Sequence, residues 1–214
     1  MPDTTQTGGQ STVLAGALLR VQPLEDASSS ETVDGEPGEE AAGVLEASGL
    51  TTLPERQFAA TSWLLGAADD REMARRQWED QGIALLCCGG ILSAVRIPAR
   101  MVWATAKSDE LGEVDAFLAR WFDGGAVFMD LHAQQYYALV PGTAEWPLKE
   151  RDFPGVSYLG RDNFLGVPEI RRTEPKGCGY WCLPMQSPGD LCYPDEVESL
   201  VLTGRAALAE GGGR

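Results

Sequence analysis

A carboxylate and the only histidine of the chain lie two residues apart, at Asp130 and His132. If residues 129–132 are extended, both side chains lie on one face, where they could ligate one metal ion or act as an acid–base pair. The alternative is a polar hairpin turn, because metal sites usually have three or four ligands. Asp162 is the further candidate, so a catalytic site in this region would use Asp130, His132 and Asp162.

Three cysteines in the C-terminal quarter of the sequence offer a second candidate site. The thiolates of Cys178, Cys182 and Cys192, with the imidazole of His132, would suit tetrahedral zinc. Their spacing differs from the usual pair of close Cys-x2-Cys hooks, which favours structural cysteines. The five cysteines follow no apolar signal segment, so we expect reduced thiols and a cytoplasmic protein.

A third candidate combines bases and an aromatic ring near residue 175. Arg171, Arg172 and Lys176, with Trp181 close behind, are the residues that could clamp and stack a single nucleic-acid strand. The alternative is a solvated loop, which the acidic balance of the chain favours.

The charge of the chain is strongly negative and unevenly distributed. Its 214 residues contain 17 bases and 32 acids, a net charge of −15, and residues 1–55 contain ten of the acids, one base and no aromatic residue. Such a segment buries too little apolar surface to fold, so we expect a disordered acidic leader over 1–55, one domain over 56–209 and a disordered tail over 210–214. The charge favours a protein partner over nucleic acid and disfavours an anionic membrane.

The remaining sequence alternates helix and strand signals. Three hairpins are predicted. The paired glycines Gly89 and Gly90 separate the first two apolar runs, the polar link 130–134 separates the runs 126–129 and 135–140, and the turn-forming residues 160–163 separate the runs 156–159 and 164–167. We expect an α+β fold, in which a mostly antiparallel sheet of hairpins is flanked by helices. The expected helices cover 59–66, 70–78, about 108–121 and the segment from 194 onward. The expected strands cover 83–88, 91–97, 126–129, 135–140, 156–159, 164–167 and 180–183.

The order of three short motifs points to a known family. A helix bearing Trp78 is followed by Gly-Ile-Ala-Leu-Leu at 82–86 and, after the paired glycines, by the apolar run 91–97. Residues 154–168 read PGVSYLGRDNFLGVP, and residues 177–181 read GCGYW. Over residues 59–201 this order resembles the N-terminal domain of bifunctional DNA primase/polymerase proteins, a branch of the archaeo-eukaryotic primase-like superfamily.

The departures from that family concern its catalytic residues. The resemblance implies an Asp-x-Asp pair on the strand 91–97, a histidine near Gln135 and a further acid at Ser157, because divalent metal must be held against a triphosphate. The strand instead contains Ala94 and Arg96, and His132 lies three residues early. The side chains on the sheet face that holds Ala94, Arg96, Gln135 and Ser157 therefore decide between the two possibilities: a carboxylate cluster there would support catalysis, and an apolar or arginine-occupied face would exclude it.

We expect a catalytically degenerate relative, without a cofactor, that acts as a non-enzymatic interaction or regulatory module. One alternative is an active nucleotidyltransferase with Mg or Mn at a relocated site built from Asp130, His132 and Asp162. A second alternative is a structural domain stabilised by zinc at the cysteines.

Overall fold

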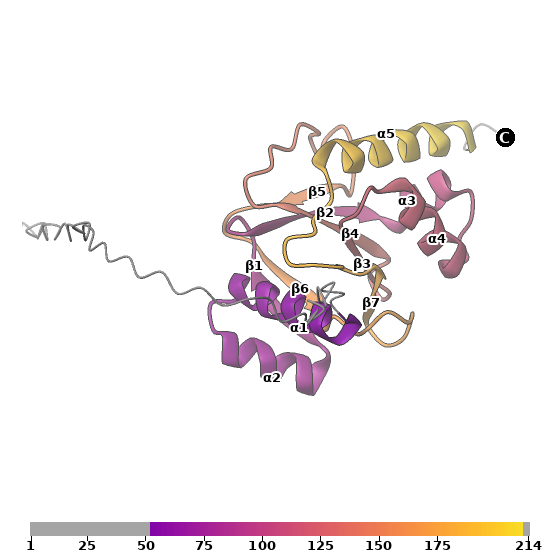
Figure 1. The fold of residues 1–214 in the computed structure, drawn as a ribbon. Helices are drawn as coiled ribbons and strands as arrows, with labels where there is room; N and C mark the ends of the chain where they lie inside the picture. Colours follow the sequence, from indigo (N-terminus) through magenta and orange to yellow (C-terminus); the bar gives the residue numbers. More distant parts are fainter. Residues whose placement is uncertain (1–51, 212–214) are drawn as a thin grey trace, which may run out of the picture. The chain divides into compact units, whose positions relative to one another are not determined.

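The computed structural model describes residues 52–211, and Figure 1 shows their course. The expected leader, apart from residues 52–55, and residues 212–214 lie outside the described part. Within 52–211 the chain forms five α-helices and antiparallel sheets, so the predicted α+β class is confirmed.

The first two helices are defined by their capping residues. Helix α1 (Leu53–Leu64) begins within the segment expected as leader, because Thr52 and Glu55 form a reciprocal capping box. A 3-10 turn, η1 (Leu65–Ala67), follows it. Helix α2 (Arg71–Gln81) was predicted correctly: the Asp70 carboxylate accepts hydrogen bonds from two backbone N–H groups of the first turn, and Gly82 ends the helix with φ 73°.

The larger sheet has five strands in the order β5-β2-β4-β3-β7. Its strands are β2 (Leu92–Pro98), β3 (Ala126–Asp130), β4 (Gln135–Pro141), β5 (Ser157–Leu159) and β7 (Gly179–Leu183). The smaller sheet pairs β1 (Ile83–Cys87) with β6 (Phe164–Pro168). Strands β3 and β4 form the predicted hairpin.

The other two predicted hairpins are wrong, because their strands exchange partners. Strand β1 pairs with β6, whereas β2 pairs with β5 and β4. Both turns exist but bend the chain instead of reversing it: the Cys88 N–H donates to the carbonyl of Asn163 (2.9 Å), so the two turns lie side by side. Residues 83–98 and 157–168 thus form one bent antiparallel ribbon, hereafter the bent ribbon.

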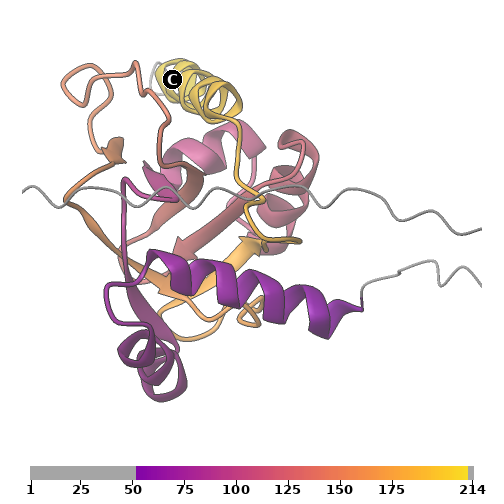
Figure 2. The same cartoon turned by 60° about the vertical axis from the view of Figure 1, so that its left-hand side comes forward.

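Helices cover both faces of the five-stranded sheet. On one face lie α3 (Ala99–Ala106), α4 (Leu111–Trp121) and α5 (Pro194–Gly211), packed against buried side chains of β2, β3, β4 and β7. On the other face lie α1, η1, α2 and the β1–β6 end of the bent ribbon. Figure 2 shows α1 and α2 on the side of the sheet opposite α5. Helix α3 was not predicted.

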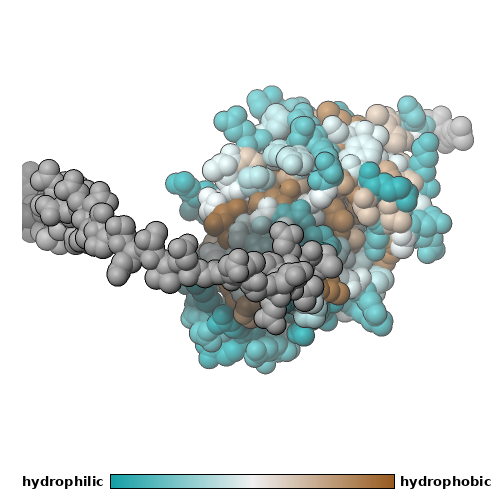
Figure 3. Space-filling view, viewed as in Figure 1, coloured by the Kyte–Doolittle hydropathy of each residue, from teal (hydrophilic) through white to brown (hydrophobic). Residues whose placement is uncertain are grey.

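The outer face of α2 is charged. Arg71, Arg75, Arg76, Glu79 and Asp80 are exposed, and the surface over this helix is mainly hydrophilic in Figure 3, with apolar areas nearer the middle of the molecule. Within residues 52–211, no helix is both long and apolar enough to cross a lipid bilayer.

The two glycines at the bend give a matched pair of variants. Gly89 has φ 86°, and a Cβ there would lie 2.4 Å from the Arg161 Cα, whereas a Cβ on Gly90 would meet nothing within 4 Å. We therefore expect Gly89→Ala to lower the free energy of unfolding by about 2 to 3 kcal/mol and Gly90→Ala to change it by less than about 0.5 kcal/mol. Urea denaturation followed by tryptophan fluorescence measures both values. Equal effects would contradict the close approach at Gly89.

Candidate functional site

One end of the five-stranded sheet has polar side chains on the face whose remaining part is covered by α1, η1 and the β1–β6 end of the bent ribbon. Arg96 is directly opposite Tyr137 and Ser157 in the strand register, and Asp130 is opposite Gln135. Residues opposite each other, or two apart on one strand, share a face. We call these five half-buried residues, Arg96, Asp130, Gln135, Tyr137 and Ser157, the polar shelf.

The rest of the same sheet face is apolar and covered. Leu92, Ala94 and Leu139 have no exposed surface and pack against α1, η1 and the β1–β6 end of the bent ribbon. The covering layer ends before it reaches Arg96, which leaves the polar shelf partly open to solvent. The sequence predicts that Ala94, Arg96, Gln135 and Ser157 share one sheet face, and the strand register confirms this placement.

The guanidinium of Arg96 is held without a carboxylate partner. Its Nη2 donates a hydrogen bond to Ser157 Oγ (2.9 Å), and its Nε is buried with no hydrogen-bond acceptor among the described residues. Arg96 takes part in none of the salt bridges within residues 52–211. Burying a cation without a counter-ion costs free energy, and an anion that pairs with it would recover part of this cost.

Tyr137 lies between the charges of the polar shelf. Its ring stacks on Phe128 with 4.9 Å between the centroids and 13° between the planes. Burial and the Asp130 carboxylate raise the pKa of the Tyr137 hydroxyl, and the cation of Arg96 partly opposes them. The hydroxyl therefore stays protonated and can donate a hydrogen bond to a ligand.

An apolar cavity of about 240 Å³ adjoins the polar shelf. We call it the slot. Phe128 and Tyr137 line it from the sheet, and Ile83 and Leu165 line it from the β1–β6 end of the bent ribbon. The carboxylate residue Asp130 is also one of its lining residues. Tyr137 belongs to both the slot and the polar shelf, so the two are continuous.

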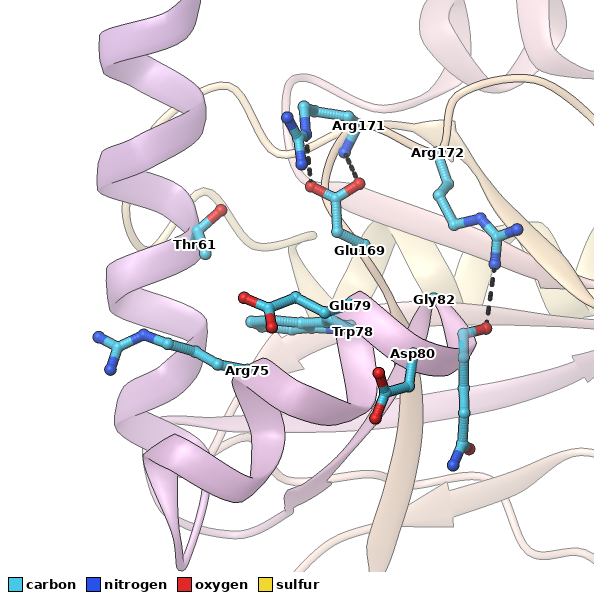
Figure 4. A pocket seen from close by; sticks show the side chains of 10 residues that line it. Thr61, Arg75, Trp78, Glu79, Asp80, Gly82, Glu169, Arg171 and Arg172 are labelled. Atoms are coloured by element: carbon cyan, nitrogen blue, oxygen red, sulfur yellow. Dashed lines mark hydrogen bonds and ion pairs between the residues drawn. The ribbon is translucent and has the colours of Figure 1, made fainter.

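A second hollow, the α2 cleft of about 550 Å³, lies between α2 and residues 169–172 (Figure 4). Its three arginines are already engaged: Arg75 pairs with Glu72, Arg171 with Glu169 (2.7 Å), and Arg172 reaches the carbonyl that ends α2. In Figure 4, Arg75 also points away from the other two arginines. Because three carboxylates line the α2 cleft as well, it has no excess positive charge.

The predicted nucleic-acid cluster is only partly assembled. Arg171 and Arg172 line the α2 cleft, but Lys176 pairs with Glu174 on the surface. The prediction that Trp181 stacks on a base is wrong, because this side chain is only 1% exposed and its Nε1–H donates to the carbonyls of residues 168 and 169. Its neighbours are core residues, so it stabilises the fold.

The three catalytic candidates do not converge. Asp130 Oδ1 accepts hydrogen bonds from the backbone N–H groups of His132 and Ala133 (both 2.9 Å), so residues 131–134 form a turn and the extended arrangement is wrong. Asp162 lies in the turn beside Gly89, near the start of β2, whereas Asp130 lies near the end of β2. The length of β2, about 20 Å, separates them.

The four zinc candidates are also dispersed. The Cys178 carbonyl accepts from Leu131 at one end of β3, whereas the Cys192 thiol contacts the Ala126 carbonyl at the other end. Cys182 is buried in the core on the opposite sheet face from the slot, and His132 is exposed. Residues 52–211 contain no group of three or more His, Cys, Asp or Glu side chains arranged to hold a metal ion.

Sequence reasoning missed a half-buried carboxylate on α4. Asp115 Oδ1 accepts a hydrogen bond from the Tyr180 hydroxyl (3.0 Å), and burial raises the pKa of Asp115. The same core raises the pKa of the Cys182 thiol, mainly by burial. Asp115 lies beside the apolar stripe of Leu111, Val114 and Leu118, which is the signal that could have identified it.

Sequence reasoning also missed Tyr137. It lies two residues after Gln135 on the same strand, so the alternation of the strand places both side chains on one face.

Comparisons with protein-family models, curated proteins and solved structures found no significant match for this chain. The resemblance to primase/polymerase domains stays a prediction from the sequence.

The raised pKa of Asp115 predicts a pH-dependent stability. The folded state binds the proton more tightly than the unfolded state, so this group favours folding at low pH, and its contribution is lost as the pH rises from about 4 through the folded-state pKa. We expect Asp115→Asn, which keeps the acceptor for Tyr180, to stabilise the protein at pH 7 by no more than about 1 kcal/mol and to have less effect at pH 3.5. Urea denaturation at both pH values measures this, with the exposed Glu210→Gln as control. A loss of stability at pH 7 would contradict the assignment.

Proposed function

We propose that this chain is a non-enzymatic interaction module, a catalytically degenerate relative of the primase/polymerase domains, that recognises an anionic group at the polar shelf. The observation that carries the proposal is Arg96, a half-buried guanidinium that makes no salt bridge within residues 52–211. An anion bound there would either regulate the domain or link the domain to the molecule that carries the anion.

The surroundings of Arg96 support an external counter-ion. Asp130 is the carboxylate of the polar shelf, but it lies on β3, with β4 between it and Arg96. Two strand spacings put about 10 Å between their backbones, and none of the salt bridges within residues 52–211 joins the two side chains. One oxygen of Asp130 is also engaged by the backbone of the following turn. A ligand carboxylate or phosphate would gain charge-assisted hydrogen bonds from Arg96 that no described residue provides.

The same residues argue against nucleotidyl transfer. A two-metal site needs carboxylates on adjacent positions of the sheet, and the corresponding positions hold buried Ala94, the cation of Arg96 and the hydroxyl of Ser157. A cation at that place would repel divalent metal. These features favour the interaction module over the relocated transferase.

A charge-removing variant tests the role of Arg96. We expect NMR titration of the full chain with acetate and with inorganic phosphate to shift backbone amide signals of Arg96, Tyr137 and Ser157. Arg96→Met should weaken this binding at least tenfold, or about 1.4 kcal/mol, because the cation that pairs with the anion is gone. Arg120→Met, on the exposed side of α4, removes the same charge elsewhere and should leave the affinity unchanged.

Two outcomes would overturn the proposal. One is the absence of any anion-induced shift at the polar shelf. The other is primer synthesis that depends on Mg or Mn and is lost in Asp130→Asn, because such activity would establish catalysis at this face. Circular dichroism of each variant separates loss of binding from loss of folding.

A further inference from the structure

We propose that the ligand of the polar shelf is a monocarboxylic acid bearing one ring or one branched alkyl group, whether as a free acid or as the C-terminal residue of a peptide. This inference rests on the proposed function and adds the slot to it. The carboxylate pairs with Arg96, and the apolar group enters the slot beside Tyr137.

The lining of the slot defines the apolar part of the ligand. Ile83, Phe128 and Leu165 supply aliphatic and aromatic surface from both the sheet and the bent ribbon. Phe128 is held flat against Tyr137 and is only 2% exposed. Both rings are thus fixed before a ligand arrives, so little side-chain entropy is lost on binding.

The volume of the slot limits the size of that group. An apolar cavity of about 150 Å³ is sufficient for benzene, whereas drug-sized ligands occupy about 300 to 1,000 Å³. The slot, with about 240 Å³, therefore holds a single ring or a leucine-sized group. A purine with its ribose exceeds it.

The strand register sets the length of the ligand. Arg96 lies directly opposite Tyr137, and such pairs have Cβ atoms about 5 Å apart. Because Tyr137 belongs to both the polar shelf and the slot, we expect a chain of about two carbons between the carboxylate and the ring. Phenylalanine at a peptide C-terminus has nearly the same separation between its carboxylate and its ring.

The charges of the site favour a monoanion. The polar shelf offers one guanidinium, and its hydroxyl groups, on Tyr137 and Ser157, are neutral donors. Asp130 is one of the residues that line the slot, and its carboxylate raises the cost of a second negative charge on the ligand. A carboxylate therefore fits better than a phosphate dianion.

The first experiment compares ligands by NMR titration of the full chain. The ligands are 3-phenylpropionate, its neutral amide, acetate, and the peptide Gly-Gly-Phe with either a free or an amidated C-terminus. We expect 3-phenylpropionate to bind with a dissociation constant on the order of 1 mM and the amide and acetate to bind at least tenfold more weakly. Preference for the free-ended peptide over 3-phenylpropionate would assign the peptide source, and the reverse would assign the free acid.

Variants of the slot separate this inference from the proposed function. A Cβ on Gly166 would lie 3.2 Å from Ile83 Cγ2, so Gly166→Val narrows the slot. Cys178 also lines the slot, and Cys178→Phe fills part of it. Each variant should weaken 3-phenylpropionate binding at least fivefold and leave acetate binding unchanged. Arg96→Met should abolish both.

The outcomes are distinct. Equal affinities for acetate and 3-phenylpropionate, both dependent on Arg96, would overturn the inference and retain the proposed function. Absence of Arg96-dependent binding by any of the ligands would overturn both. Tight binding of 3-phenylpropionate that both slot variants leave unchanged would place the ring elsewhere and also overturn the inference.

Discussion

The contact between the two turns of the bent ribbon is the constraint on which the rest of the fold depends. At Gly89 the backbone approaches Arg161 so closely that any side chain would collide, and the Cys88 N–H is satisfied by the carbonyl of Asn163. Because both segments bend at the same place, β2 and β5 stay in the large sheet while β1 and β6 leave it together. Strands β1 and β6 contribute the buried side chains of Leu86 and Val167, which cover one face of the large sheet.

That covering layer also creates the candidate site. It buries the sheet face over Leu92, Ala94 and Leu139 but ends before Arg96, so one strand passes from a dry environment to a half-open one within a few residues. Charged groups at such a boundary are partly desolvated yet reachable, which strengthens their interaction with a ligand relative to a fully exposed position. The slot forms at the same boundary, between the end of the bent ribbon and the sheet. Polar recognition and apolar recognition are therefore adjacent because one structural feature generates both.

Much of the local structure could be predicted from the sequence, because local chemistry determines it. Asp70 and Gly82 delimit α2, and Pro194 starts α5, by rules that act within one turn of helix. The partners of β1 and β2 could not be predicted from the sequence. Gly89 permits the chain either to reverse or to bend, and only the distant residues 157–168 decide between the two. Helix α3 was missed because it is short and follows Pro98 directly. For the site, the sequence singled out the sheet face that holds Arg96 and Ser157, but the slot depends on the bend of the ribbon, which has no local sequence signal.

The bent ribbon has a consequence for how the chain folds. Its outermost pair joins Ile83 to Pro168, so more than 80 residues must be synthesised before β1 meets its partner. Because the ribosome adds about 5 to 20 residues per second, we expect the apolar side chains of β1 to stay uncovered for several seconds during synthesis. The β3–β4 hairpin, by contrast, closes locally and at once. Long-range pairs slow folding, so the small sheet is expected to form last, and the slot, which it walls, exists only in the fully folded protein.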